Sequence, residues 1–85
     1  MACWLYILEC HATCRYYVGS AENIDHRLSE HNSGRVDSTR AFGPWQVIYK
    51  EEHTNRSAAT KREREIKSKK SRRWIEYHLL KIRTE

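Results

Sequence analysis

The stretch WLYIL at residues 4–8 is followed by the stretch YYVGS at residues 16–20, and these two stretches decide the fold. Both are short, aromatic and apolar, a composition that favours β-strands. The segment CHATC at residues 10–14 lies between them and is short enough for a hairpin connection. We therefore predict two paired strands, over residues 3–9 and 15–19.

The register of this hairpin decides where two tyrosines point. If the turn lies at His11-Ala12, Tyr6 and Tyr17 lie opposite each other on one face of the sheet. A slip of one residue would place them on opposite faces, because successive side chains along a strand alternate between faces. The turn lacks the Asn-Gly or Asp-Gly pair that would set the register, so the sequence leaves both arrangements open.

A polar helix is predicted after the hairpin, with Asn23 as its N-cap and Gly34 at its end. Ile24, Leu28 and His31 recur at helical spacing and define the side that faces the sheet. Arg27 comes three residues after Ile24 and four before His31, so it falls on the same side. This helix should therefore present two cationic groups beside its apolar anchors.

The remaining chain predicts one strand and two helices. Over residues 45–50, Trp45, Val47 and Tyr49 alternate with more polar neighbours, which indicates a third strand. Ser57 can cap a second helix that runs to about Lys67, and a third helix is expected from about residue 71 to residue 82. The element order β-β-α-β-α-α predicts a small sheet with helices packed on it, in the α/β (α+β) class.

The composition of the chain indicates which binding partners and which cellular location to expect. The 85 residues fit one small domain spanning residues 1–85, and the net charge of +5 favours polyanionic partners, nucleic acid first and acidic membrane surfaces second. No apolar run approaches the roughly 18 residues that a membrane-spanning helix needs. No secretory signal is visible, and the three cysteines gather at one end, which fits a reducing, cytoplasmic setting.

Glu63 is the sharpest clue to chemistry in the second predicted helix. It lies four residues after Ala59 and three before Ile66, so it shares the side that packs on the sheet. A carboxylate there is costly unless it is paired or bound to a metal. One interpretation is an ion pair with Arg27 or another base. The alternative is a hard divalent cation held by one carboxylate, water and a substrate phosphate.

The two tyrosines and the helical histidine also admit two interpretations each. Tyr6 and Tyr17 could simply pack on the sheet, and His31 could interact with the end of its helix. Together with Arg27 and Glu63, however, they could orient water and stabilise a charged phosphate. Cys10 and Cys14 invite a zinc interpretation, but no second ligand pair follows downstream.

Basic residues are concentrated between positions 61 and 73. A solvated helix face explains part of this density, and the alternative for the rest is a ridge that contacts phosphates. Trp74 follows the ridge and is expected to pack the third helix. The candidate nucleic-acid-binding residues are Lys61, Arg62, Lys67, Lys69, Lys70, Arg72 and Arg73.

Five segments in this order resemble the GIY-YIG nuclease superfamily, over about residues 4–80. They are WLY at 4–6, YVG at 17–19, RLSEHNSG at 27–34, GPW at 43–45 and REREIK at 62–67. The first keeps only the tyrosine of Gly-Ile-Tyr, and the second matches Tyr-Ile-Gly with valine for isoleucine. The last two segments are similar to those of the small, single-domain bacterial group within the superfamily.

The resemblance implies a fold, a reaction and a site. The fold is a three-stranded antiparallel sheet flanked by helices, and the reaction is phosphodiester hydrolysis with one Mg²⁺ or Mn²⁺ ion. Tyr6 and Tyr17 would position or activate the water, with Tyr6 as the base. The other implied roles are transition-state stabilisation by Arg27, metal binding by Glu63, assistance from His31 and close backbone approach at Gly19.

These implications predict an endonuclease that acts on nucleic acid, with DNA as the expected substrate. Because a chain of this size offers little surface for base recognition, we expect structure-directed or weakly specific cleavage, in DNA repair or recombination. Two alternatives stay open. One is a nucleic-acid-binding module without catalysis, and the other is an adaptor that binds a protein through exposed tryptophans.

Overall fold

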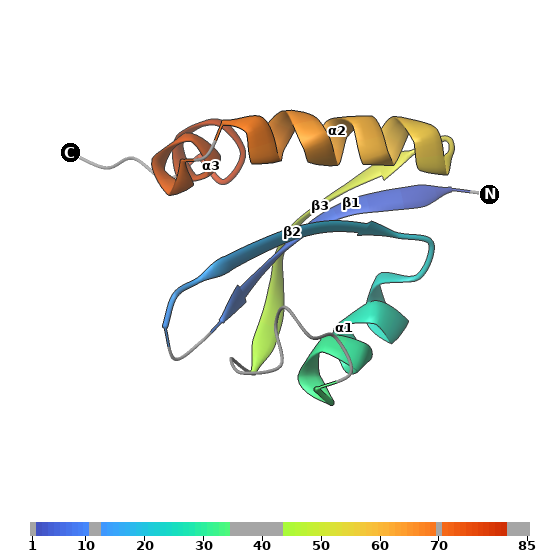
Figure 1. The fold of residues 1–85 in the computed structure, drawn as a ribbon, viewed down its shortest axis with the longest axis horizontal. Coiled ribbons are helices and arrows are strands. Elements are labelled where there is room, and N and C mark those ends of the chain that lie inside the picture. Colours follow the sequence, from blue (N-terminus) through green and yellow to red (C-terminus); the bar gives the residue numbers. More distant parts are fainter. Residues whose placement is uncertain (1, 11–12, 35–43, 70, 82–85) are drawn as a thin grey trace.

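A computed structural model describes residues 2–10, 13–34, 44–69 and 71–81 of the chain. The predicted order β-β-α-β-α-α is confirmed (Figure 1). The strands are β1 (Cys3–Cys10), β2 (Tyr16–Ala21) and β3 (Trp45–His53), and the helices are α1 (Ile24–Asn32), α2 (Arg56–Ser68) and α3 (Arg72–His78).

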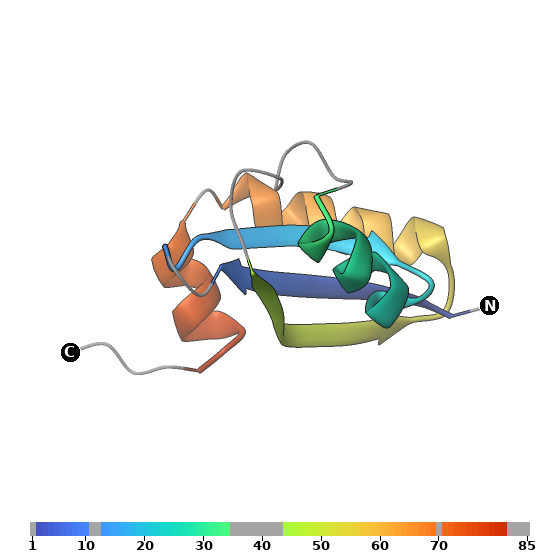
Figure 2. The same ribbon diagram turned by 90° about the horizontal axis from the view of Figure 1, so that it is seen from below.

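The three strands form one antiparallel sheet in the order β2-β1-β3. Helices α2 and α3 cover one face of this sheet, and α1 covers the other (Figures 1 and 2). The first strand is therefore central and enclosed on both sides, which is why nearly all of its residues are apolar. The second strand, β2, lies at one edge of the sheet.

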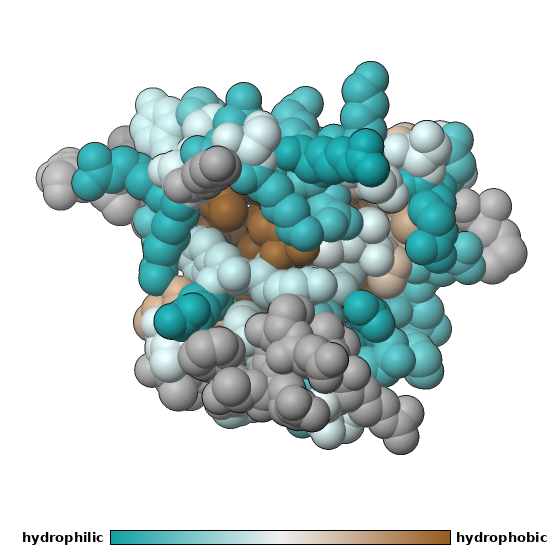
Figure 3. Space-filling model, in the orientation of Figure 1, coloured by the Kyte–Doolittle hydropathy of each residue, from teal (hydrophilic) through white to brown (hydrophobic). Residues whose placement is uncertain are grey.

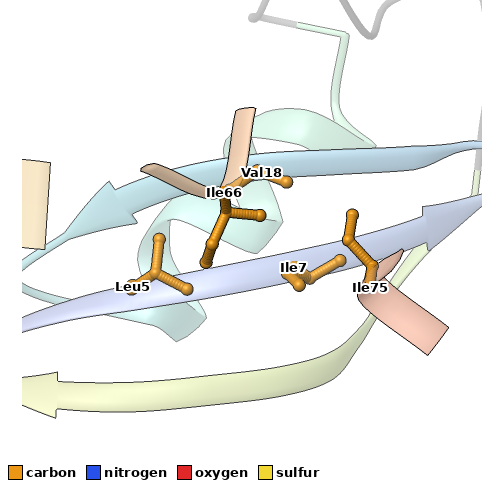
Figure 4. Close-up of a cluster of buried hydrophobic side chains, with 5 residues drawn as sticks. All are labelled: Leu5, Ile7, Val18, Ile66 and Ile75. Carbon is orange, nitrogen blue, oxygen red and sulfur yellow. The ribbon is translucent and has the colours of Figure 1, made fainter. Parts of the chain in front are cut away.

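Two apolar clusters, one on each face of the sheet, make up the core. The cluster under α2 and α3 consists of Leu5, Ile7, Val18, Ile66 and Ile75 (Figure 4). The cluster toward α1 is built around Tyr6, Leu8, Cys10 and Trp45. This division follows from the alternation of side chains along a strand.

The β1–β2 pairing differs from the predicted one by two residues. Tyr6 pairs with Gly19, and Tyr17 pairs with Leu8. The two tyrosines are thus diagonal neighbours instead of direct partners, and the turn residues 11–12 lie outside the described ranges. A shift of two residues preserves the face on which a side chain lies, so both tyrosines still point toward α1.

A β-bulge interrupts the third strand, so the continuous alternation predicted for it is wrong. Val47 pairs with Leu8 while Tyr49 pairs with Ile7, and the register shifts between these pairs. Consequently Val47 packs toward α1, whereas Tyr49 packs against the opposite cluster. The strand also extends beyond the predicted residues 45–50, to His53.

The helix ends follow local capping chemistry. Asn23 caps α1 as predicted, and Gly34 follows α1 with φ 81. The N-cap of α2 is Asn55 instead of the predicted Ser57, because the Asn55 side chain accepts a hydrogen bond from the amide of Ala58 at 2.9 Å. No helix in the described ranges is long and apolar enough to cross a membrane.

The third helix is shorter than the predicted span of residues 71–82. It ends at His78, and the backbone amides of Leu79 and Leu80 both donate to the carbonyl of Ile75. Lys81 then has φ 56, a left-handed conformation that does not continue an α-helix. The two leucines pack against the core instead, and residue 82 lies beyond the described chain.

Candidate active site at the edge of β2

Three aromatic rings meet between the sheet and α1. The ring centroids of Tyr17 and His31 are 4.7 Å apart, and those of Tyr6 and Tyr17 are 6.5 Å apart. The sheet register brings the two tyrosines to one face, and the helical spacing of α1 turns His31 toward them. Trp45, which the sequence did not single out for the site, encloses Tyr17 at a centroid distance of 6.5 Å.

Tyr6 is a buried phenol held by two neighbours. Only 1% of the residue is exposed, and its hydroxyl lies 3.3 Å from Nε2 of His31. Burial raises the pKa of Tyr6 to about 12, although a hydrogen bond from Arg27 opposes this shift. The hydroxyl therefore keeps its proton at neutral pH, and it can orient a water or take up a proton only while passing its own to a neighbour.

His31 is suited to receive that proton. It is as buried as Tyr6, and burial, together with the charge of Arg27, lowers its pKa below the ordinary 6.5 while Glu30 opposes the shift. The imidazole is consequently neutral at pH 7 and carries one unprotonated ring nitrogen. When that nitrogen is Nε2, it accepts a hydrogen bond from the Tyr6 hydroxyl.

The lowered pKa of His31 predicts a loss of stability in mild acid. Between pH 6.5 and the lower folded-state pKa, the unfolded chain binds a proton that the folded chain does not bind, so the free energy of unfolding falls as the pH falls. Urea unfolding at pH 8 and at pH 5.5 should show a smaller loss in His31→Gln than in the unchanged protein. Equal losses would contradict a buried, neutral His31.

Gly19 makes room for the Tyr6 ring that lies across it. A Cβ atom added at this position would sit 2.7 Å from the Tyr6 hydroxyl oxygen and 2.9 Å from its Cζ. Both distances are too short for any side chain. The resemblance described above implied a close backbone approach at Gly19, and in the structure the ring of Tyr6 lies against this residue.

Replacing Gly19 with alanine should displace Tyr6 and destabilise the fold by about 1–3 kcal/mol, the usual cost of overpacking. The measurement is the free energy of unfolding in urea for Gly19→Ala, Tyr6→Leu and the double variant. If the clash is the cause, the double variant is more stable than additivity predicts, because leucine removes the colliding atoms. Additive costs would contradict the clash.

Glu63 approaches from α2, on the other side of the β2 edge. Its Oε1 accepts a hydrogen bond from Ser20 Oγ at 2.9 Å, and its Oε2 pairs with Lys67 Nζ at 2.7 Å. The ion pair with a base is therefore present, but the base is Lys67; Arg27 pairs with Glu30 at 3.2 Å. The Glu63 charge still raises the pKa of Tyr6, so it acts across the strand edge.

The surface along this edge is exposed to ligands. Figure 3 shows hydrophilic side chains of α2 above a patch of hydrophobic surface. The Glu63 side chain is 22% exposed there, and Lys67 Nζ also lies 5.8 Å from the centre of the Tyr17 ring. Lys67 thus links the carboxylate on one side of β2 with the aromatic group on the other.

The donor set suits a hard divalent cation that retains water. A carboxylate offers about four lone-pair positions, and Ser20 and Lys67 use two of those on Glu63. Mg²⁺ is commonly held by one or two carboxylates together with water and substrate phosphates. In the described residues no group of three His, Cys, Asp or Glu side chains could hold a metal, so an all-protein cage such as a zinc site is not formed there.

Some basic side chains of the predicted ridge form ion pairs with carboxylates, and for others no ion pair is described. Arg62 is bound by Glu51, with Nε 3.1 Å from Oε1, and by Glu65. Arg72 lies 3.4 Å from Glu76 and stacks over Tyr16. Among the candidate nucleic-acid-binding residues, the exposed side chains for which no ion pair is described are Lys61, Lys69 and Arg73. Lys70 lies outside the described residues.

Ser20 was not predicted as a site residue. It follows Gly19, so its side chain points to the opposite face from Tyr6 and meets Glu63. Strand alternation would have placed it toward the second helix, but the contact joins residues 43 positions apart in the sequence. Such a pair becomes visible only once the helix is docked on the sheet.

Comparison with known proteins gives consistent matches. A family model described as the GIY-YIG catalytic domain matches residues 2–78. A UPF0213 protein from Oceanobacillus iheyensis is 37% identical over 75% of this chain and 74% of its own length. One from Natronomonas pharaonis is 36% identical over 76% of each chain. The solution NMR structure of a UPF0213 protein from Bacillus halodurans has a TM-score of 0.55 and 32% identity, and covers 89% of this chain and 80% of that one.

Proposed function

Because this chain belongs to the GIY-YIG catalytic domain family, we propose that it is a metal-dependent endonuclease that hydrolyses phosphodiester bonds in nucleic acid. DNA is the proposed substrate. The observation that carries the proposal is the position of Glu63 across the β2 edge from the Tyr6–His31 pair. A partly exposed carboxylate for a cation and a buried proton-accepting pair thus lie on the two faces of one edge strand.

Each residue of the candidate active site has its own role in the proposed reaction. A Mg²⁺ or Mn²⁺ ion held by Glu63 would polarise the scissile phosphate. Tyr17 and the Tyr6 hydroxyl orient the attacking water. The water proton passes to the Tyr6 oxygen as the phenol gives its own proton to Nε2 of His31. This exchange leaves Tyr6 neutral throughout, as its raised pKa requires.

In this proposal, Arg27 and the exposed basic side chains interact with the negatively charged phosphates of the substrate. Arg27 is hydrogen-bonded to Tyr6, and its guanidinium would stabilise the negative charge that accumulates on a phosphate as water attacks. Lys61, Lys69 and Arg73 would bind flanking phosphates, and Lys67 would move from Glu63 to a phosphate as the cation binds. Phosphate contacts carry no sequence information, which supports structure-directed or weakly specific cleavage.

The proposal also covers the domain organisation, the cellular process and the location of the protein. We propose that residues 1–85 form one domain and that cleavage serves DNA repair or recombination. Cys3 and Cys14 are free thiols, which supports a reducing, cytoplasmic location.

A second candidate function has one observation in its favour. Lys67 Nζ occupies the Glu63 oxygen that would bind a cation, at 2.7 Å. If this ion pair persists when nucleic acid binds, the protein is a binding module without catalysis. Direct metal titration of the protein separates the two functions, because the binding module would take up no Mn²⁺ at Glu63.

The experiment that tests the proposal is cleavage of a labelled panel. It contains single-stranded, duplex, flap and four-way-junction DNA and single-stranded RNA, each with Mg²⁺, Mn²⁺ or chelator. Cleavage of DNA that needs the metal and begins within the strand supports the proposal. Binding without cleavage under every metal condition would contradict it and favour the binding module.

A further inference from the structure

The third helix carries an exposed aromatic group that the proposed reaction does not use. Tyr77 is 64% exposed, more than any other large hydrophobic side chain described. Its ring meets His78 at a centroid distance of 5.0 Å, and His78 meets Trp74 at 4.9 Å. We call Trp74, Tyr77 and His78 the aromatic strip.

Packing accounts for Trp74 but not for Tyr77. The helix is anchored by buried Ile75, and Trp74 packs partly against the same core cluster. Tyr77 follows two positions after Ile75 and therefore points away from the sheet. Its ring adds no core contact, so the outer half of the aromatic strip is available to a ligand.

Two basic side chains lie next to rings of the aromatic strip. Arg73 precedes Tyr77 by four positions and is exposed, so the two side chains are neighbours on one helix surface. Lys69 Nζ lies 5.4 Å from the centre of the Trp74 ring. An exposed aromatic ring with basic side chains beside it is the arrangement that binds single-stranded nucleic acid, with a base on the ring and phosphates on the cations.

The aromatic strip is tied to the strand that carries the candidate active site. Tyr16 donates a hydrogen bond to Glu76 at 3.1 Å and stacks under Arg72, so α3 is fixed to the first residue of β2. Tyr17, the next residue, belongs to the active site. Figure 1 shows α3 beyond the end of α2, beside the start of β2. A strand bound along the β2 edge would therefore lead toward α3.

We propose that the aromatic strip stacks an unpaired base next to the cleavage site, so that the substrate is DNA with a single-stranded arm. The inference rests on the proposed function and names its substrate class. Bases in a duplex are already stacked on one another and present no free face to Tyr77. The aromatic strip should therefore distinguish armed or single-stranded DNA from a blunt duplex of the same charge.

The test is fluorescence anisotropy with labelled single-stranded, armed and blunt duplex DNA in chelator, which prevents cleavage. Tyr77→Ala should weaken binding of single-stranded and armed DNA by roughly 5- to 100-fold, since stacking on one aromatic ring contributes that much. Blunt duplex binding should change less than about 2-fold, since it relies on phosphate contacts. Tyr77→Trp should restore binding, and Arg73→Gln should weaken all three DNAs.

The outcomes separate this inference from the proposed function. If Tyr77→Ala weakens the three DNAs equally, or none of them, the aromatic strip does not stack a base, whether or not the protein cleaves. If Tyr77→Ala selectively weakens armed DNA but no metal supports cleavage, the aromatic strip stands and the nuclease proposal fails. Because Tyr77 is exposed, its replacement should leave the thermal midpoint unchanged, which circular dichroism checks.

Discussion

Replacing Glu63 with glutamine is expected to reduce metal-dependent cleavage by about 10³-fold or more. A divalent cation supplies several kcal/mol of transition-state stabilisation, and each 1.36 kcal/mol corresponds to a factor of ten in rate. Glutamine keeps the shape of the side chain, and its carbonyl can still accept the hydrogen bond from Ser20. The fold should therefore survive, while the negative charge that holds the cation is lost.

Glu65 provides the matched control for this experiment. It lies two positions further along α2, is more exposed than Glu63 and pairs with Arg62. Glu65→Gln removes the same charge from the same helix and should retain cleavage within a few-fold. Calorimetric titration with Mn²⁺ gives a second readout, in which only Glu63→Gln loses binding. Full activity of Glu63→Gln, or its loss in Glu65→Gln, would remove Glu63 from the reaction.

Tyr6→Phe is expected to reduce the cleavage rate by roughly 10²- to 10⁴-fold, the usual contribution of general acid–base catalysis. The change removes only the hydroxyl, so the ring continues to pack over Gly19 and beside His31. Substrate binding should change little, because the role proposed for the buried hydroxyl is to orient the attacking water and not to hold the flanking phosphates. Single-turnover rates at saturating protein separate these two effects.

Tyr49 tests whether the loss of another tyrosine hydroxyl, one that is only partly buried, would give the same result. Burial and the hydrogen bond to Glu51 raise the pKa of Tyr49 to about 12, the same value as for Tyr6. Tyr49, however, packs on the sheet face opposite to His31. Tyr49→Phe should therefore keep the cleavage rate. If Tyr6→Phe and Tyr49→Phe behave alike, the contact between Tyr6 and His31 has no part in catalysis.

Much of the fold follows from short-range patterns in the sequence. The alternation along β1 separates Leu5 and Ile7 from Tyr6, and the two sets do line opposite faces of the sheet. Helical spacing brings Arg27 and His31 of α1 to the tyrosines. These patterns succeed because strand and helix periodicities assign each side chain to a face before any tertiary contact forms.

The sequence could not reveal features that depend on long-range pairing. The bulge in β3 carries no glycine or proline, and it rotates Tyr49 to the face opposite the predicted one. Similarly, Ser20 is a partner of Glu63 only because α2 docks beside β2. The base that pairs with Glu63 is different, because Lys67 lies four residues further along the same helix and this spacing can be read from the sequence.

The edge position of β2 has a topological consequence for any polymer that binds there. In the described part of the chain no further strand pairs with β2, so Tyr17 and Glu63 flank a ledge and not a tunnel. A polymer can be laid onto a ledge at any point along its length. A tunnel must instead be threaded from a free terminus. Closed circles are therefore as accessible to this surface as linear strands of the same sequence.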